Sequence, residues 1–344
     1  MTVRLNEIAV RAGVSVSTVS RVLNERPGVN QHTRRQVLTA IDVLGYDRPY
    51  RLRPRASGLV GLILPELENP FFPRFAHLVE SHLTRAGFAP VLCSQTLGGT
   101  HEDEYVQMLL EHAVSGIVFV SGVHALADSM PERYNRLVDM GLPFVCVNGA
   151  LAGVPAPFLS TDDVATVELA LHHLRQMGHE RIGITLGQPR YQPVQRRAEA
   201  FRAALRRLDL VPDDLFVDQL VECTTYTVEG GSVGAQRLIE RGVTGILCGS
   251  DVMALGVLRA ARQAGLRVPE DLSVVGSDDS LLVEFTDPPL TTVRQPAAAL
   301  AEAACRELMD QIAGNHAHQG EVLYQPELVV RGSTGRAPAT DAIG

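Results

Sequence analysis

The chain has 344 residues, of which 45% are hydrophobic and 20% are charged. A chain of this length and composition can bury a sizeable core in two or three domains, which excludes global disorder. All 31 basic residues are arginines. This excludes every mechanism that needs a lysine, such as a Walker-type phosphate loop, a Schiff base or an SxxK nucleophile pair.

Compartment and redox state follow from the apolar runs and the cysteines. No apolar run reaches the roughly 18 residues that a membrane span requires, and the polar N-terminus lacks the apolar stretch of a signal peptide. The cysteines are far apart, with no CxxC pair, and each lies in or near an apolar run: Cys93, Cys146, Cys223, Cys248 and Cys305. This pattern predicts reduced, buried thiols in a cytoplasmic protein, without disulfides or a metal site.

Charge is divided unevenly along the chain. Residues 1–55 hold ten arginines against four acidic residues, a net charge of +6, whereas the remaining residues carry −14. A basic segment attached to an acidic body indicates that only the basic segment meets a polyanion. A chance fluctuation would give the same balance, so the motifs must decide.

Three short helices are predicted in the basic segment. Apolar residues recur at helical spacing over residues 5–12, and Gly13 is a natural stop. Ser15 can cap a second helix that begins near Val16, and a third helix is predicted over residues 31–44. Two short helices joined by a tight turn match the helix-turn-helix layout, whose second helix enters the major groove of DNA. Any small three-helix domain is the alternative.

The amino-acid sequence of this segment supports the helix-turn-helix interpretation. The motifs are Asn6-Glu7-Ile8-Ala9, the run from Ala12 to Asn24 (AGVSVSTVSRVLN), Thr33-Arg34 and Leu44-Gly45-Tyr46. Over more than forty residues the segment strongly resembles the head of the LacI/GalR family of bacterial transcription regulators. The resemblance implies that Val16, Ser17 and Arg21 read base edges. It also implies that Ser15, Thr18, Asn30 and Thr33 contact phosphates.

Val16 and the following linker depart from a simple match. Val16 projects nearer to the apolar face than Ser17 does, so it belongs partly to the core. In the family the linker becomes a helix whose leucine opens the minor groove. Here Leu52 is the candidate wedge, but Pro49 and Pro54 bracket it, and a proline disfavours helical geometry at the residue before it. A solvated linker is an equally good interpretation.

The acidic body alternates short apolar runs with amphipathic stretches. Apolar runs include 59–64, 91–93, 116–120, 144–147, 182–186, 245–248 and 272–275; helical stretches include 74–86, 164–177, 196–208, 252–264 and 297–313. This alternation predicts parallel sheets covered by helices. Three pairs of segments also match each other: Gly61-Leu-Ile-Leu matches Gly183-Ile-Thr-Leu, Val114-Ser-Gly-Ile-Val matches Val243-Thr-Gly-Ile-Leu, and 142–148 matches 272–278. Nearly constant offsets predict two similar α/β lobes with a ligand cleft at the carboxyl ends of their strands.

The body also resembles the LacI/GalR effector domain, which is similar to periplasmic sugar-binding proteins. The motifs are PELENPFF at 65–72, GHERIG at 178–183, SDVMALG at 250–256, VVGSDDS at 274–280 and PPLTTVRQP at 288–296. The resulting fold class is an all-α helix-turn-helix head followed by a two-lobed, periplasmic-binding-protein-like α/β domain with parallel sheets. We assign the head to residues 1–47, the hinge or linker to 48–58, the effector and dimerisation domain to 59–332, and a flexible tail to 333–344.

A sugar site needs polar groups that grip vicinal hydroxyls and an aromatic face for the C–H side. Candidate polar contacts are Asn148, Asp251 and Asp278 at predicted strand ends, and Arg197, which matches the family's effector-gripping arginine; candidate stacking faces are Phe71, Phe72 and Tyr226. Helix capping is the alternative for Asp251, and core packing for Phe72. Gly149 and Ser277 stand where the family usually has an arginine and an aromatic residue, so the effector differs from those of well-known members.

The leading hypothesis is a dimeric repressor that binds palindromic half-sites in double-stranded DNA and responds to a small molecule, most simply a sugar. An effector-dependent activator is an alternative. A plain solute-binding protein is disfavoured by the basic head, and an α/β enzyme by the absence of a phosphate-loop motif. No cofactor or metal is expected, since His172, His173 and His179 lack the spacing of metal ligands. No heptad leucines follow Arg331, so a dimer is expected rather than a coiled-coil tetramer.

Overall fold

The computed structural model describes residues 2–24, 26–44, 58–95, 100–208, 214–316 and 318–338. The chain divides into two compact units, Met1–Ser57 and Gly58–Gly344, here named the head and the body. No helix in the described residues is long and apolar enough to cross a membrane.

The described residues of the head form three α-helices, as predicted. They are α1 (Thr2–Ala12), α2 (Val16–Leu23) and α3 (Gln31–Val43). Gly13 has a φ of +64°, a left-handed conformation that glycine adopts without strain, and it turns the chain from α1 towards α2. The buried side chains come from all three helices: Ile8, Ala9, Val19, Val22, Val37, Ala40 and Ile41. The periodicity of the sequence therefore identified both the helices and their inner faces.

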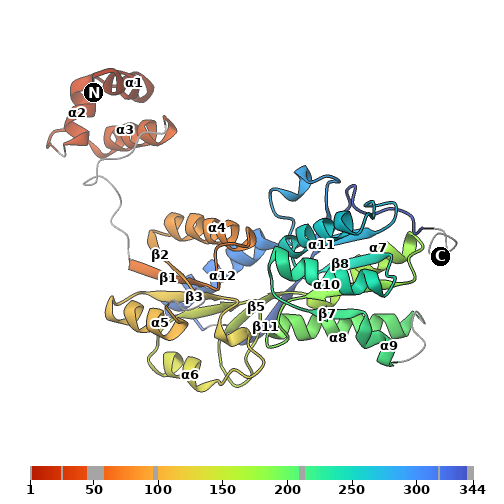
Figure 1. Ribbon diagram of the computed structural model, residues 1–344. Coiled ribbons are helices and arrows are strands. Elements are labelled where there is room, and N and C mark those ends of the chain that lie inside the picture. The colour runs from red at the N-terminus through yellow and green to blue at the C-terminus, as the bar shows by residue number, and fades with distance from the viewer. Residues whose placement is uncertain are drawn as a thin grey trace. The chain divides into compact units, whose positions relative to one another are not determined.

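The N lobe takes its elements from residues 58–161 and 297–324 of the body, and its sheet is parallel throughout. The strand order is β11-β5-β4-β3-β1-β2. The strands are β1 (Gly58–Leu64), β2 (Phe88–Ser94), β3 (Gly116–Val120), β4 (Phe144–Val147), β5 (Pro157–Thr161) and β11 (Gly320–Tyr324). The helices are α4 (Phe71–Arg85), α5 (Glu102–Glu111), α6 (Glu132–Asp139) and α12 (Ala297–Ile312). Figure 1 shows α4 and α12 on one face of this sheet and α5 and α6 on the other, so two apolar layers cover it.

The C lobe repeats the arrangement with the order β12-β10-β9-β8-β6-β7. Its strands are β6 (Ile182–Leu186), β7 (Val221–Cys223), β8 (Gly245–Cys248), β9 (Ser273–Ser277), β10 (Thr291–Arg294) and β12 (Glu327–Val329). Its helices are α7 (Asp163–Gln176), α8 (Gln192–Arg207), α9 (Asp214–Gln219), α10 (Val228–Glu240) and α11 (Asp251–Gln263). Only β12 runs antiparallel to its neighbour, a departure from the parallel sheet that we predict.

The internal repeat is confirmed by the two strand orders, in which β1, β3 and β4 occupy the places of β6, β8 and β9. Two glycines share one role in the repeat. A Cβ at Gly61 would lie 2.4 Å from Leu109 Cδ1, and a Cβ at Gly183 would lie 2.7 Å from Leu238 Cδ2. In each lobe, therefore, a glycine lets a leucine of the covering helix approach the strand closely.

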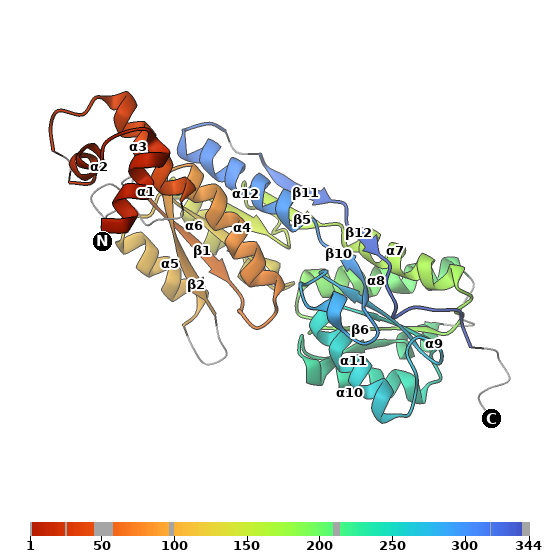
Figure 2. The ribbon, with the colours of Figure 1, turned by 90° about the horizontal axis from the view of Figure 1, so that it is seen from above.

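The described chain crosses between the lobes three times, from β5 to α7, from β10 to α12 and from β11 to β12. Figure 2 shows the four strands concerned lying together where the lobes meet. Thr161 donates to Gln295 Oε1 at 2.9 Å, which joins two of these crossings. The lobes are thus connected by a short, hydrogen-bonded hinge.

Two smaller predictions have mixed outcomes. Four cysteines are buried as expected, but Cys223 is exposed at the end of β7, a short strand at the edge of the sheet. His173 Nε2 lies 2.9 Å from Thr334 Oγ1, and His179 is bonded to Thr244 and to the Gly335 carbonyl. These buried histidines attach residues 334 and 335 to the C lobe, so the beginning of the segment that we assign to a flexible tail is packed and hydrogen-bonded instead.

Candidate functional site

The first candidate site is the exposed face of α2 in the head. Ser15 caps the helix, because its Oγ accepts a hydrogen bond from the Thr18 backbone at 3.1 Å. Ser17 and Arg21 are exposed on the side opposite the buried Val19. A serine and an arginine on the open face of a capped, positively charged helix can donate to base edges and phosphates. The geometry is what a recognition helix requires.

Val16 lies against the core of the head, whereas Asn30, a candidate phosphate contact, lies at the start of α3. Val16 is partly buried and packs against the head core, so its reading of a base stays a prediction. Asn30 Oδ1 accepts from the Thr33 backbone at 2.7 Å, so Asn30 caps α3, and its contact with a phosphate stays a prediction. Leu52, the candidate wedge, lies outside the described residues.

The second candidate site lies in the body, around Arg197 of α8. This side chain is only 6% exposed. Its Nε donates to Asp163 Oδ1 at 2.7 Å, and its Nη1 donates to the Gly249 carbonyl at 2.9 Å. Asp163 is equally buried, and burial raises its pKa although Arg197 opposes the shift. Sequence reasoning missed Asp163, whose signal was a pair of aspartates directly after a strand.

Asp278 is the carboxylate at the end of β9. Its backbone N–H donates to the Val293 carbonyl, and its φ is +122°. Oδ1 accepts from Gln295 Nε2 at 2.6 Å, and Oδ2 accepts from Asn69 Nδ2 at 3.4 Å. Burial and the neighbouring Asp251 charge raise its pKa to about 7. The side chain therefore joins the hinge glutamine to the start of the N-lobe helix α4.

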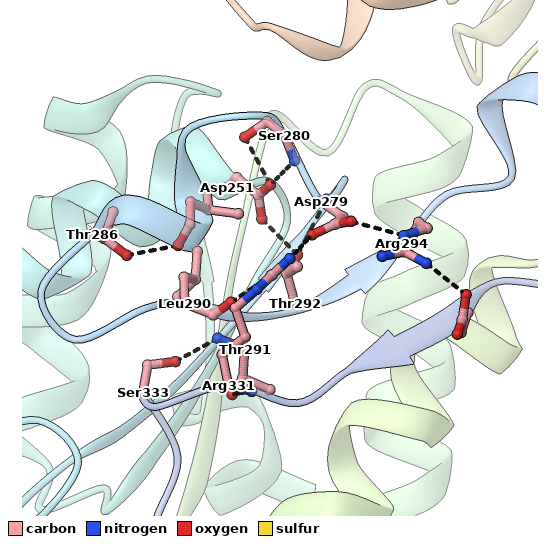
Figure 3. A network of polar contacts seen from close by, with 12 residues as sticks. Asp251, Asp279, Ser280, Thr286, Leu290, Thr291, Thr292, Arg294, Arg331 and Ser333 are labelled. Carbon is pink, nitrogen blue, oxygen red and sulfur yellow. Dashed lines mark hydrogen bonds and ion pairs between the residues drawn. The ribbon is translucent and has the colours of Figure 1, made fainter.

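Asp251 has a different environment from the one we predict. Its Oδ2 accepts from the Ser280 N–H at 2.7 Å and from the Ser280 hydroxyl at 2.9 Å, and its Oδ1 accepts from Thr292 Oγ1 at 2.6 Å. Figure 3 shows these contacts enclosing the carboxylate. Burial raises its pKa to about 6. Ser250, not Asp251, caps α11, because its Oγ accepts from the Met253 N–H at 3.2 Å. The capping alternative for Asp251 is therefore wrong, and its carboxylate instead binds Ser280 and Thr292. A direct effector contact stays a prediction.

Asp279, the next residue after Asp278, accepts from two arginines. Arg294 Nε donates at 2.7 Å and Arg331 Nη2 at 2.6 Å, as Figure 3 shows. Arg74 of α4 donates to its backbone carbonyl at 3.1 Å. The segment that follows β9 is therefore held by ion pairs within the C lobe and by a hydrogen bond from the N lobe.

Asn148 stands at the end of β4, the strand equivalent to β9. Its backbone N–H donates to the Leu159 carbonyl, and its φ is +64°. Its Nδ2 donates to Ser121 Oγ at 3.1 Å. Asn148 and Asp278 thus occupy equivalent strand ends in the two lobes, as the repeat predicts. A shared contact with one effector stays a prediction.

The aromatic candidates differ from one another. Phe71 is buried in the N-lobe core and stacks on Phe75 at 6.0 Å between ring centroids, so the expectation of a stacking face for a sugar is wrong in this arrangement. Phe72 is only partly buried and meets Phe71 edge-on. Tyr226 lies within the electrostatic reach of Arg197, and burial raises its pKa to about 12. Phe72 and Tyr226 remain candidate faces.

Comparison with known proteins gives consistent matches for both units. Residues 4–48 match the bacterial regulatory proteins of the lacI family, and residues 171–334 match a periplasmic binding protein-like domain. The chain is 54% identical over 339 residues to the HTH-type transcriptional regulator MalR of Streptomyces coelicolor, with 98% of each chain covered.

Solved structures show the same likeness over nearly the whole chain. A transcriptional regulator CelR-cellobiose complex is 30% identical with a TM-score of 0.70, over 96% of this chain and 99% of that chain. The lac repressor dimer bound to operator and the anti-inducer ONPF is 25% identical with a TM-score of 0.67, over 95% and 98% of the two chains. Together with the fold of both units, these matches show that the chain belongs to the lacI family of bacterial regulatory proteins.

Proposed function

We propose that this protein is a transcription repressor that binds operator DNA through α2 and releases it in response to a sugar bound between the lobes. The observation that carries the proposal is the exposed Ser17 and Arg21 on a capped helix, within the segment that matches the lacI family. A solute-binding protein would share the body but would have no use for this helix. DNA binding also places the protein in the cytoplasm and requires no catalytic activity.

The chemistry around Arg197 supports a sugar as the effector. A guanidinium and a carboxylate grip neighbouring hydroxyls with bidentate, charge-assisted hydrogen bonds, and Arg197 and Asp278 supply these groups. Tyr226 offers the adjoining aromatic face. The structural relative at 30% identity is described as a complex with cellobiose, which makes a disaccharide the first choice here.

The surface of the C lobe supports a homodimer. Leu281, Leu282 and Phe285 are 74%, 66% and 74% exposed, and a monomer rarely leaves such a cluster in water. Two heads also hold two half-sites one DNA turn apart. The lac repressor relative is described as a dimer bound to operator.

The experiment selects an operator from a randomised duplex library with the full chain, and then measures binding by fluorescence anisotropy. Cellobiose, maltose, ribose and adenosine are titrated into the complex. We expect Arg21→Ala to lose about 1–3 kcal/mol on the selected operator and much less on random DNA. Failure to enrich any sequence, or equal losses on both DNAs, would overturn the assignment of α2 as the base-reading helix.

Light scattering of the operator complex tests the assembly separately. One dimer per operator is expected. A single chain per operator, or a tetramer, would contradict the proposed dimer.

A further inference from the structure

Apart from the polar groups around Asp278, the lobes meet along a second set of contacts, here named the interlobe seam. It consists of residues 190–192 of the C lobe facing residues 124–127 and Ala150 of the N lobe. Leu126 and Tyr191 form an isolated antiparallel bridge, and the Ala127 N–H donates to the Arg190 carbonyl at 2.8 Å. The seam therefore has a short backbone pairing of its own.

One side chain makes more contacts across the seam than this backbone pairing does. Gln192 Nε2 lies 3.3 Å from both the His124 and the Leu126 carbonyls, and Gln192 Oε1 accepts from the Ala150 N–H at 3.2 Å. The side-chain amide thus uses both its N–H donors and its carbonyl acceptor across the seam. Gln192 begins α8, the helix that also carries Arg197, and its acceptor side reaches the loop that follows Asn148. It links the two candidate effector regions without belonging to either.

The N-lobe side of the seam is supported from beneath by a buried polar pair. The Tyr134 hydroxyl donates to Glu102 Oε1 at 2.7 Å and accepts from the His124 N–H at 2.8 Å. Glu102 Oε2 accepts from the Val123 N–H at 2.9 Å. Glu102 and Tyr134 are each only 1% exposed. Buried polar groups that are fully bonded fix the backbone they bind, so this pair holds the loop in the shape that presents its carbonyls.

We propose that Gln192 is a positioning residue that keeps the two lobes closed, and that the Tyr134–Glu102 pair acts through it by holding the loop over residues 123–126. Closure brings Asn148 and Arg197 towards each other, so the consequence for effector retention rests on the proposed function. The closing action itself does not, because every contact lies within the body.

The test measures hydrogen exchange of the Ala127 amide in the full chain without added ligand. That amide bonds across the seam to Arg190, and a substitution at Gln192 leaves its partner in place. Because a local opening exposes the amide, its exchange rate reports how often the seam separates. We expect Gln192→Leu to raise the rate on the order of tenfold, the effect of losing side-chain hydrogen bonds worth about 1.4 kcal/mol.

Gln195→Leu is the matched control. It is the same change three residues along α8, where the glutamine Nε2 donates to the Pro189 carbonyl at 2.8 Å, within its own lobe. In Gln195→Leu, the Ala127 amide should exchange at the same rate as in the unaltered chain. An unchanged rate in Gln192→Leu, or an equal rise in both variants, would overturn the proposal.

A double substitution tests the supporting pair. Tyr134→Phe alone should raise Ala127 exchange several-fold, whereas in the Gln192→Leu background it should add little, because the contact through which it acts is gone. Full additivity would show that Tyr134 serves only the stability of the N lobe. If the unaltered chain binds no operator, the proposed function fails while these exchange measurements still decide the role of Gln192.

Discussion

The two lobes place different chemistry at the same point of the fold. Asn148 and Asp278 both follow a central strand, both have positive φ, and both donate a backbone hydrogen bond to the next strand. Asn148 bonds to a neutral serine, whereas Asp278 lies among a second buried aspartate, a buried arginine and a hinge glutamine. The two lobes repeat the same fold, but the strand end in the C lobe is surrounded by charged side chains and the equivalent strand end in the N lobe by neutral ones.

The largest expected effect on stability and effector binding is in the C lobe, where the charged side chains lie. Arg197→Ala leaves Asp163 buried without its partner, which costs about 3–5 kcal/mol of unfolding free energy, and it removes the group that grips the effector. Urea denaturation measures the first loss. Titration of an effector found in the sugar panel measures the second, for which we expect about 2 kcal/mol or more. Operator binding should survive, because the head is a separate unit.

The double variant Arg197→Met with Asp163→Leu separates the two losses. It replaces the buried ion pair by apolar side chains, so stability should return while effector binding should not. Recovery of effector binding in this variant would remove Arg197 from the site.

The second effect is a pH dependence. Asp278 has a folded pKa of about 7, above the value near 3.9 of an unfolded chain. Between these values the folded state holds more protons, so the free energy of unfolding falls as pH rises from about 4 to 7 and then levels off. The shift corresponds to at most roughly 4 kcal/mol. Asp278→Asn should flatten this slope in urea titrations at pH 5 and pH 8.

Asp271 provides the opposite case for comparison. Its bonds with Arg267 hold its pKa at about 2, so its contribution is present above the unfolded value and is lost only as the pH falls from about 4 to 2. Asp271→Asn should therefore leave the slope between pH 5 and pH 8 unchanged. An equal flattening by both substitutions would contradict the assignment to Asp278.

The third effect concerns the partners of the buried aspartate Asp251. Thr292→Val keeps the side-chain shape but removes the donor at 2.6 Å. A hydrogen bond to a charged group contributes about 1.5–3 kcal/mol, so the melting temperature should fall at pH 8. The loss should shrink near pH 5, where Asp251 is protonated, because its pKa is about 6. A loss that is the same at both pH values would show that the hydroxyl acts by packing alone.

The smallest effect on stability is expected in the N lobe, where the contacts of Asn148 are uncharged. Ser121→Ala removes the partner of Asn148, a bond between uncharged groups worth about 0.5–1.5 kcal/mol. The loss in thermal unfolding should be independent of pH from 5 to 8. If it exceeds that of Thr292→Val, the contrast between the two strand ends is not one of charge.

Much of this fold could be predicted from the sequence because the central strands are unbroken apolar runs. β3, β4, β6 and β8 begin and end where the runs at 116–120, 144–147, 182–186 and 245–248 do. β5 and β10 were missed, because Ser160 and Thr161 in one and Thr291, Thr292 and Arg294 in the other interrupt the apolar pattern. Their polar side chains bond to residues outside their own strand, as Thr161 does to Gln295 and Thr292 does to Asp251, and a local pattern does not reveal such partners.

The site could be predicted only in part. Strand ends and the family resemblance pointed to Asn148, Arg197 and Asp278. Asn69 reaches Asp278 across 209 positions of sequence, and no spacing rule describes such a contact. The prediction of Phe71 as a stacking face was wrong for a related reason. Which of two adjacent phenylalanines faces the core depends on where α4 begins.

The three crossings between the lobes also govern the order in which the body is completed during synthesis. The N lobe takes α12 and β11 from residues 297–324, and the C lobe takes β12 from residues 327–329. A ribosome that has produced the first five strands of the N lobe has therefore made an unfinished sheet, whose missing strand and covering helix arrive after most of the other lobe. Until then the β5 edge and the face beneath α12 are unpaired. The two lobes are consequently completed together, once residues 297–329 have been made.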